Sequence, residues 1–133
     1  MPQSIDSIVV GSCVVDVLVR PVDLDSPIGG GRLVRTEPLE LTTGGIVSNA
    51  GIAMARLAMR VAACSLVGDD PWASVIRSHY EEEGVDASRL AARPGGATST
   101  TAVLIAADGE RSFLHAVGAP KQIDREFFFS QLD

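Results

Sequence analysis

The sequence predicts an α/β fold with a doubly wound sheet and a small second β-sheet attached to it. Three features carry this prediction: an early apolar run that closes on Gly-Ser, a helix–strand–helix alternation in the middle, and a hairpin pattern toward the end. The chain has 133 residues, of which 46% are hydrophobic, which is enough to bury the core of one domain.

The first third of the chain is predicted to contain strands and a glycine-rich loop. Residues 8–11 form an apolar run typical of a central buried strand. Residues 14–19 continue as a second extended piece, which carries Asp16 to a sheet edge. Proline and glycine punctuate residues 21–31 and indicate a mobile loop, after which residues 33–41 have a strand pattern.

The middle of the chain alternates between helix and strand. Apolar residues recur at helical spacing over residues 47–59, and Thr43 or Ser48 is placed to cap that helix. Residues 61–67 form an apolar, strand-like run. A second helix is predicted over residues 71–83, because an aspartate precedes its first-turn proline and a glycine follows its end.

The last third predicts a β-hairpin and a short helix. Residues 98–107 and 111–117 are strand-like and are joined at Asp108-Gly109, the sequence of a two-residue primed turn. Residues 123–132 are predicted to form a helix that carries three consecutive phenylalanines.

Charge and composition argue against several function classes. The chain has 17 acidic and 11 basic residues and no basic stripe, so neither a nucleic acid nor an anionic membrane is expected as a partner. Its apolar runs are interrupted long before the roughly 20 residues that a membrane span needs. The first residues lack the basic and apolar pattern of a signal peptide, so a cytoplasmic protein is expected.

The pair Gly44-Gly45, followed one helical turn later by Asn49, is the most informative motif. Two glycines let the backbone approach a ligand closely, and the first N–H groups of the following helix turn toward that ligand. The Asn49 amide can both donate to and accept from a hydroxyl. The chain has no Gly-x-Gly-x-x-Gly and no Walker lysine, which favours hydroxyls over phosphates. An ordinary tight loop before a helix is the alternative.

Asp16 lies where the first extended region ends, at the carboxyl end of a strand, and open α/β sheets collect their ligands there. Its carboxylate can accept hydrogen bonds from two neighbouring hydroxyls, and a solvated turn aspartate is the alternative. Thr100 and Ala102, at the mouth of the hairpin, are placed to touch such a ligand from above, with plain strand residues as the alternative.

No metal site is predicted. Asp69 and Asp70 are adjacent carboxylates, but two neighbours on one turn are too few ligands, and helix capping explains them. His79 and His115 have no second His, Cys or Glu at ligand spacing, so neither is assigned a chemical role.

The stretch GGIVSNAGIAMARLAMRVAACSLVGDDPW resembles the amino-terminal signature of the ribokinase-like (PfkB) carbohydrate kinases. The strand IVVGSCVVD and the segment TSTTAVLIAADGERSFLHAVGA extend the resemblance, in the family's order, over nearly the whole chain. It implies a ribokinase-like, Rossmann-like sheet with a small β-sheet lid, whose strands lie near 14–42 and 98–117. Residues 1–133 would then form the substrate-binding N-terminal part of such a domain.

The resemblance implies a kinase that uses ATP and Mg²⁺ to phosphorylate a sugar or nucleoside hydroxyl. Asp16, Gly44, Gly45 and Asn49 match the positions that hold the sugar in the family. The family's catalytic base lies in a Gly-Ala-Gly-Asp turn, which this sequence lacks, so no catalytic residue is expected in this chain. The chain looks like a truncated half without the ATP-binding half, inactive and without bound cofactor by itself.

Two departures from the family pattern bear on the substrate. Ribokinases carry Asn two residues before the sugar-binding Asp, where this chain has Val14, and Lys after the double glycine, where it has Ile46. Ribose is therefore not favoured, and another pentose, a hexose or a nucleoside stays open.

Two other classes of protein remain as alternatives. One is a non-catalytic carbohydrate-binding or oligomerisation module that keeps the sheet and lid. The other is a Rossmann-type nucleotide binder, which the glycine spacing after the first strand disfavours. The lids of some family members pair, and exposed hairpin edges make a homodimer through the lid strands plausible here as well.

Overall fold

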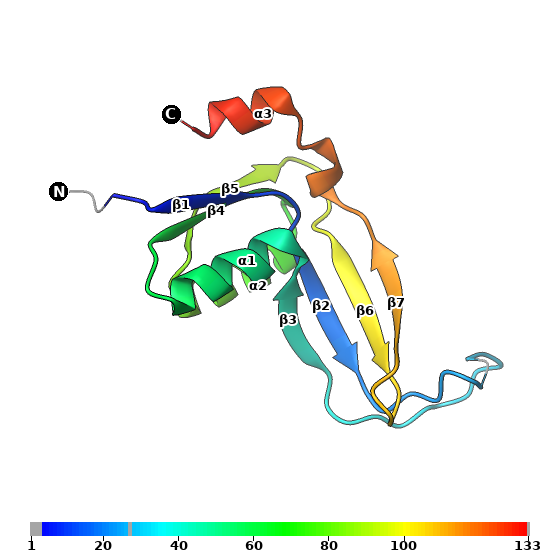
Figure 1. Ribbon diagram of the computed structural model, residues 1–133. Coiled ribbons are helices and arrows are strands. Elements are labelled where there is room, and N and C mark those ends of the chain that lie inside the picture. Colours follow the sequence, from blue (N-terminus) through cyan, green and yellow to red (C-terminus); the bar gives the residue numbers. More distant parts are fainter. Residues whose placement is uncertain (1–3, 27, 133) are drawn as a thin grey trace.

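The computed structural model describes residues 4–26 and 28–132. These residues form two β-sheets that meet at one junction, with helices on the first sheet (Figure 1). The strands of the first sheet run in the order β1-β4-β5, and those of the second in the order β3-β2-β6-β7. The elements are β1 (Ser7–Val10), β2 (Val14–Val19), β3 (Glu40–Gly44), α1 (Gly45–Arg56), β4 (Val61–Gly68), α2 (Pro71–Glu82), β5 (Asp86–Arg93), β6 (Thr100–Ile105), β7 (Arg111–Ala116), η1 (Ala119–Gln122) and α3 (Arg125–Ser130).

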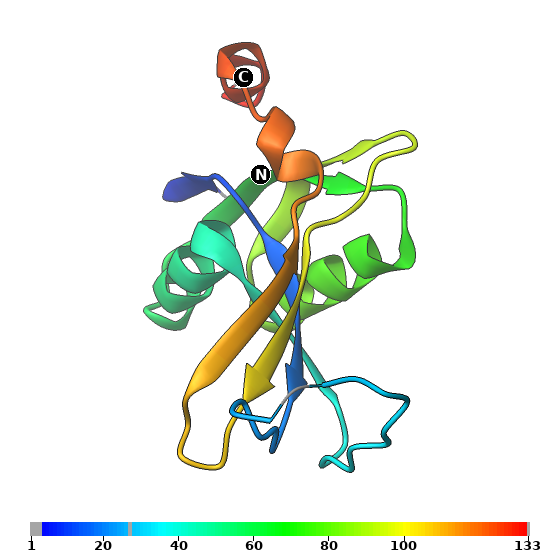
Figure 2. The ribbon, with the colours of Figure 1, turned by 90° about the vertical axis from the view of Figure 1, so that its right-hand side faces the viewer.

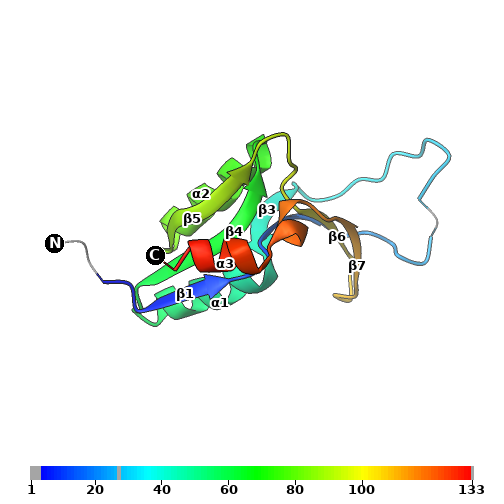
Figure 3. The same ribbon diagram turned by 90° about the horizontal axis from the view of Figure 1, so that it is seen from above.

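The first sheet is parallel and lies between helices. Helices α1 and α2 lie on one of its faces, and α3 lies over the other (Figures 1 and 3). Strand β4 is buried along its whole length because it is the central strand between these layers. The main core forms on the side of α1 and α2, where it includes Val47, Val61, Ala63, Val67, Ile76, Tyr80 and Val85.

The second sheet extends away from the helices as a lid (Figure 2). Strand β2 is central in it, antiparallel to β3 and parallel to β6, and β7 closes the other edge by pairing antiparallel with β6. Strand β7 is exposed at every position. The α/β layer with a projecting β lid is the ribokinase-like architecture that the sequence predicted.

The connections between the two sheets pass through one junction. They are the segments 11–13, 44–45, 94–99 and 117–118. Side chains hold these segments in place: Ser65 Oγ of β4 donates to the Gly11 carbonyl at 2.6 Å, and Ser99 Oγ accepts from the Gly118 N–H at 2.9 Å. The junction is therefore a fixed framework on which the candidate site is built.

Helix α2 begins as the sequence predicted. Asp70 is its N-cap and accepts a hydrogen bond from the N–H of Ala73 at 3.2 Å, with Pro71 in the first turn. The same carboxylate accepts from the N–H and the hydroxyl of Thr98, at 2.8 and 2.6 Å. Capping thus accounts for Asp70, while Asp69 accepts from the N–H of Gly95.

Helix α1 differs from the prediction at both ends. It spans Gly45–Arg56 rather than residues 47–59, and its N-cap, Gly44, provides no side-chain hydrogen bond. Neither Thr43 nor Ser48 caps the helix, because α2 engages both hydroxyls.

Three features of the strands also differ from the prediction. Strand β5 was not predicted, and residues 33–39 contain no strand, so β3 begins only at Glu40. Asp16 lies within the central strand β2 rather than at a sheet edge. The hairpin turn is longer than two residues: Ala106 pairs with Glu110, and Gly109 takes a positive φ of 91°.

No helix in the described part of the chain is long and apolar enough to cross a membrane.

Candidate functional site

The corner at which β3 ends and α1 begins, formed by Gly44 and Gly45, is the centre of the candidate site. Gly45 takes a φ of 81°, a conformation that favours glycine, and a Cβ added there would lie 2.5 Å from the carbonyl oxygen of Ser12. That oxygen accepts a hydrogen bond from the N–H of Val47 at 3.1 Å, in the first turn of α1. A Cβ added at Gly44 would collide with the carboxylate of Asp16. The two glycines therefore allow α1 and Asp16 to approach the same stretch of bare backbone.

Asp16 lies on the lid strand next to this corner. Val14, two residues before Asp16 on the same face of β2, pairs with Gly44, and Asp16 itself pairs with Thr42 on β3. Partial burial raises the pKa of the Asp16 carboxyl above its ordinary value, although the hydroxyl of Thr101 and the nearby His115 act in the opposite direction. A partly desolvated carboxylate with few protein donors is suited to accept hydrogen bonds from a ligand.

The residue of β6 next to Asp16 is Thr101. The register pairs Thr101 with Asp16, whereas Thr100 pairs with Val15 and Ala102 with Val17. Since side chains alternate along a strand, Thr100 and Ala102 face the side of the lid opposite to Asp16. The structure therefore does not bring these two predicted residues to the site, and Thr101 takes their place.

His115 lines the cavity beside the candidate site, and the sequence analysis assigned it no role. It pairs with Thr101 across β6 and β7, and its Nδ1 lies 2.9 Å from the Thr101 hydroxyl. Only the hairpin register could have indicated it, because that register places His115 on the same face as Asp16.

A cavity of about 380 Å³ lies beside the corner. Gly45 lines it from α1 and His115 from the lid, so the cavity separates the α/β layer from the lid sheet. Asp16 is adjacent through Gly44 and His115 rather than part of the lining itself. The lining residues are Ser12, Cys13, Val14, Gly45, Ser99, His115, Val117, Pro120 and Lys121.

Asn49 lies on α1 one turn after Gly45, so the two residues share a face of the helix. Its side chain is exposed, and no described residue forms a hydrogen bond with its amide. Asp16, Gly44 and Gly45 thus meet at one corner, and Asn49 lies one helical turn from it with an exposed amide.

Helix α2 holds the corner from both sides. Before the double glycine, Thr43 Oγ1 lies 2.9 Å from Nδ1 of His79, and after it, Ser48 Oγ lies 2.6 Å from the Tyr80 hydroxyl. Ser48 and Tyr80 are both fully buried, and burial raises the pKa of Tyr80. The position of the corner therefore depends on two consecutive residues of a distant helix.

We expect Tyr80→Phe to lower the unfolding free energy of the full-length protein by about 1–3 kcal/mol, because it leaves the buried Ser48 hydroxyl without a partner. The double variant Ser48→Ala/Tyr80→Phe should lose less than the sum of the single variants. Urea unfolding measures the free energies of unfolding of the single and double variants. The control is Ser78→Ala at an exposed position of the same helix, which should change the unfolding free energy little. Strictly additive losses would show that the two hydroxyls do not interact.

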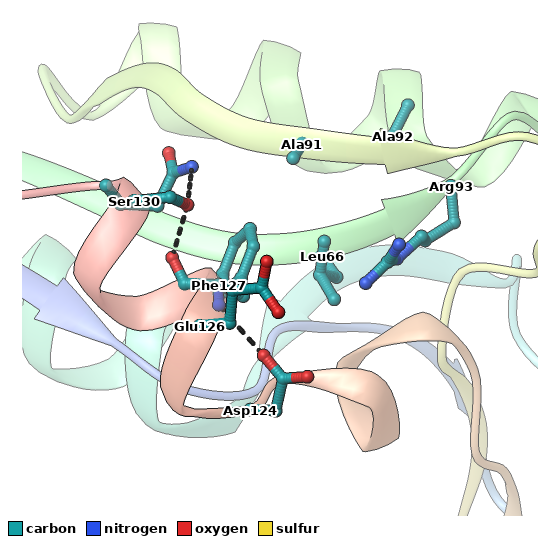
Figure 4. Close-up of a pocket in the computed structure, with 9 residues that line it drawn as sticks. Leu66, Ala91, Ala92, Arg93, Asp124, Glu126, Phe127 and Ser130 are labelled. Atoms are coloured by element: carbon teal, nitrogen blue, oxygen red, sulfur yellow. Dashed lines mark hydrogen bonds between the residues drawn. The ribbon is translucent and has the colours of Figure 1, made fainter.

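A second cavity, of about 480 Å³, lies between α3 and the first sheet (Figure 4). Phe127 of α3 and Leu66 of β4 both line it, and two of its polar residues, Asp124 and Ser130, are engaged in local hydrogen bonds. Asp124 accepts from the N–H of Phe127 at 2.8 Å, and Ser130 donates to the Phe127 carbonyl at 2.7 Å. These polar groups are used in local helix structure, so this groove is a weaker candidate than the corner despite its size.

The fold defines a class: an α/β domain from which a β lid projects beside the candidate site. Residues 4–132 match the pfkB family of carbohydrate kinases, and the chain belongs to that family.

Curated relatives agree with this assignment. A fructokinase of Vibrio alginolyticus is 39% identical over 74 residues, which are 56% of this chain and 24% of the relative. A fructokinase of Klebsiella pneumoniae is 32% identical over 109 residues, which are 82% of this chain and 31% of the relative. The matched part of the chain thus spans 24% to 31% of the length of these relatives.

Solved structures share the fold. The ribokinase of Giardia lamblia superposes with a TM-score of 0.79 at 23% identity, covering 96% of this chain and 40% of that one. A ribokinase of Cryptococcus neoformans in complex with ADP gives a TM-score of 0.65 at 27% identity, with 87% and 35% covered. An Arabidopsis thaliana ribokinase complexed with ribose and ATP gives 0.68 at 20% identity, with 88% and 37% covered.

Proposed function

We propose that this chain is the substrate-binding part of an ATP-dependent sugar kinase, which transfers the γ-phosphoryl group of ATP to a hydroxyl of a sugar or nucleoside. The observation that carries the proposal is the Asp16 carboxylate against the bare backbone of Gly44, beside a cavity of about 380 Å³. A carboxylate and an amide around exposed backbone suit a polyol, whose hydroxyls donate and accept hydrogen bonds.

Fructose is the first substrate to test. Two curated relatives are fructokinases, and this chain has Val14 and Ile46 where ribokinases carry Asn and Lys. Both replacements remove polar groups beside the corner, which disfavours ribose. A hexose therefore ranks before a pentose or a nucleoside.

The residues of the corner would act by positioning. Asp16 would accept hydrogen bonds from two sugar hydroxyls, and Asn49 would hold a third. The backbone at Gly45 would set how closely the sugar approaches α1. Fixing one hydroxyl toward the phosphoryl donor converts a bimolecular step into an effectively unimolecular one, which can supply several kcal/mol of the barrier reduction, up to about 7–11 kcal/mol in well-oriented cases.

ATP supplies the phosphoryl group, and its site would lie outside the corner. Among the described residues, no three His, Cys, Asp or Glu side chains gather where they could hold a metal ion, so these residues do not fit Mg²⁺ on their own. The printed sequence also lacks the Gly-Ala-Gly-Asp turn. We therefore expect residues 1–133 alone to be inactive, and ATP use makes the cytoplasm the expected location.

The experiment is a coupled ADP-release assay on the full-length gene product with fructose, ribose and adenosine. We expect fructose to give the highest kcat/KM and residues 1–133 alone to give no sugar-dependent ADP. ADP release that does not depend on any sugar would contradict the proposal.

Thermal unfolding separates the proposal from its rivals, because a ligand that binds the native state raises Tm. A sugar kinase should be stabilised by sugars and by nucleotides. Stabilisation by sugars without ADP release would favour a non-catalytic carbohydrate-binding module, and stabilisation by nucleotides alone would favour a nucleotide binder.

A homodimer through the lid is the assembly that we propose. The face opposite Asp16 carries an apolar row across all four strands, and its outer members Leu41 and Leu114 are 53% and 62% exposed. Edge strands β3 and β7 also offer unpaired backbone groups. Sedimentation should show a dimer that Leu114→Glu dissociates while Glu110→Gln, in the exposed turn, does not. If the native protein sediments as a monomer, as Leu114→Glu does, this assembly is contradicted.

A further inference from the structure

His115 offers an uncommitted ring nitrogen to the candidate site. Its Nδ1 lies 2.9 Å from the hydroxyl of Thr101, and its side chain lines the cavity that Gly45 lines from the other side. No described residue forms a hydrogen bond with its Nε2. One nitrogen is thus held by the lid sheet, and the other is available to a ligand.

The partners of Thr101 determine which nitrogen of His115 carries the proton. Thr101 pairs with Asp16 across β6 and β2, and its hydroxyl lowers the pKa of the Asp16 carboxyl as a hydrogen-bond donor does, while the same hydroxyl lies 2.9 Å from Nδ1 of His115. An ionised carboxylate only accepts, so the single hydroxyl proton of Thr101 is donated to Asp16. The Thr101 oxygen must then accept from Nδ1–H of His115. In the neutral ring this leaves Nε2 as a hydrogen-bond acceptor.

We propose that His115 is a specificity-determining residue of the sugar site, whose Nε2 accepts a hydrogen bond from one substrate hydroxyl while Asp16 accepts from its neighbours. This inference rests on the proposed function. It adds that the substrate must present hydroxyl donors toward two separate strands of the lid, β2 through Asp16 and β7 through His115.

The surroundings of His115 agree with a role in binding. Thr101 is only 6% exposed, so its hydroxyl is fixed by packing, whereas the His115 side chain is exposed. The pairing of β6 with β7 already fixes the hairpin through the backbone, so the lid does not need this imidazole for its register. Lys121, from η1, lines the same cavity and only donates, which complements the acceptor at His115.

The first test is steady-state kinetics of the full-length protein with a sugar that it phosphorylates. We expect His115→Phe to raise the KM for the sugar at least tenfold, with kcat and the KM for ATP within about twofold of the native values. His115→Gln, which keeps a polar group near the position of Nε2, should recover part of the loss. Ser112→Ala is the matched control, because Ser112 lies on the other face of the same strand.

Monodeoxy analogues of the sugar test the contact itself. One analogue should bind the native protein about tenfold more weakly and lose nothing further with His115→Phe, because the substitution and the missing hydroxyl remove the same hydrogen bond. If every analogue loses affinity equally in both proteins, the inference is overturned.

The tautomer is measured by ¹⁵N NMR of the histidine ring, which needs no catalytic activity. We expect a protonated Nδ1 at His115 in the native protein and in Thr101→Ser, and a changed tautomer in the isosteric Thr101→Val. An unprotonated Nδ1 in the neutral ring of the native protein would overturn the inference. If His115→Phe phosphorylates the sugar as well as the native protein does, this inference alone is overturned. If the native protein binds no sugar, the proposed function is overturned together with the inference.

Discussion

Asp16→Ala in the full-length protein is expected to raise the dissociation constant of the sugar by about 10²- to 10⁴-fold while leaving that of ATP within about threefold. Hydrogen bonds to a charged group contribute about 1.5–3 kcal/mol each, and the substitution removes two of them. Partial burial, which raises the pKa of this carboxyl, indicates a site in which water does not replace those bonds fully. Isothermal titration of each ligand measures both constants.

Asp108→Ala is the matched control for this change. It removes the same charge from the same lid, but Asp108 lies in the exposed hairpin turn, where, among the described residues, its carboxylate accepts only a local bond from the N–H of Glu110. Sugar binding should stay unchanged in this variant. Equal losses of sugar and ATP affinity in Asp16→Ala would count against the assignment of Asp16.

Alanine at the two glycines of the corner is expected to separate binding from stability. Gly44→Ala keeps an allowed backbone, since φ is −138°, but its Cβ would displace the Asp16 carboxylate. In Gly44→Ala, the affinity for the sugar should therefore fall at least tenfold with little change in Tm. Gly45→Ala should lower both, because its φ is 81° and its Cβ would press on the carbonyl of Ser12 at 2.5 Å.

Gly84→Ala controls for backbone strain alone. Its φ is 74°, close to that of Gly45, and nothing lies within 4 Å of an added Cβ. A left-handed conformation costs a residue with a Cβ about 1–2 kcal/mol, so Tm should fall while sugar affinity stays constant. Native sugar affinity in Gly44→Ala would contradict the binding of the sugar by the Asp16 carboxylate that lies against Gly44.

Local sequence signals predicted the α/β layer well. The N-cap at Asp70 and the proline after it fixed the start of α2, and the continuous apolar run from Val61 identified the central strand. Such signals act within a few residues of one another, so no knowledge of the fold is needed to interpret them.

Elements that depend on distant partners were not predicted. Strand β5, DASRLAAR, lacks both alternation and β-branched residues, and it exists because β4 provides a parallel partner. Residues 33–39 show the reverse: their sequence has a strand pattern, but the segment pairs with no strand and its apolar side chains stay exposed, such as Leu33 at 81%. Pro38, without an N–H, adds to this.

The prediction of the candidate site depended on local and distant signals in the same way. Gly44, Gly45, Asn49 and Asp16 could be named from their spacing and from the family pattern. On β6, however, the prediction was off by one residue, because a one-residue shift in register moves every side chain to the other face of a sheet. The sequence contains no signal for that choice, and His115 was missed for the same reason.

The most direct test of the central claim is a crystal structure of the full-length protein with the sugar that it phosphorylates. The account predicts sugar hydroxyls within hydrogen-bonding distance of the Asp16 carboxylate and the Asn49 amide, with the ring against the backbone of Gly45. A sugar bound elsewhere, such as in the groove between α3 and the first sheet, with the corner filled by solvent, would contradict it.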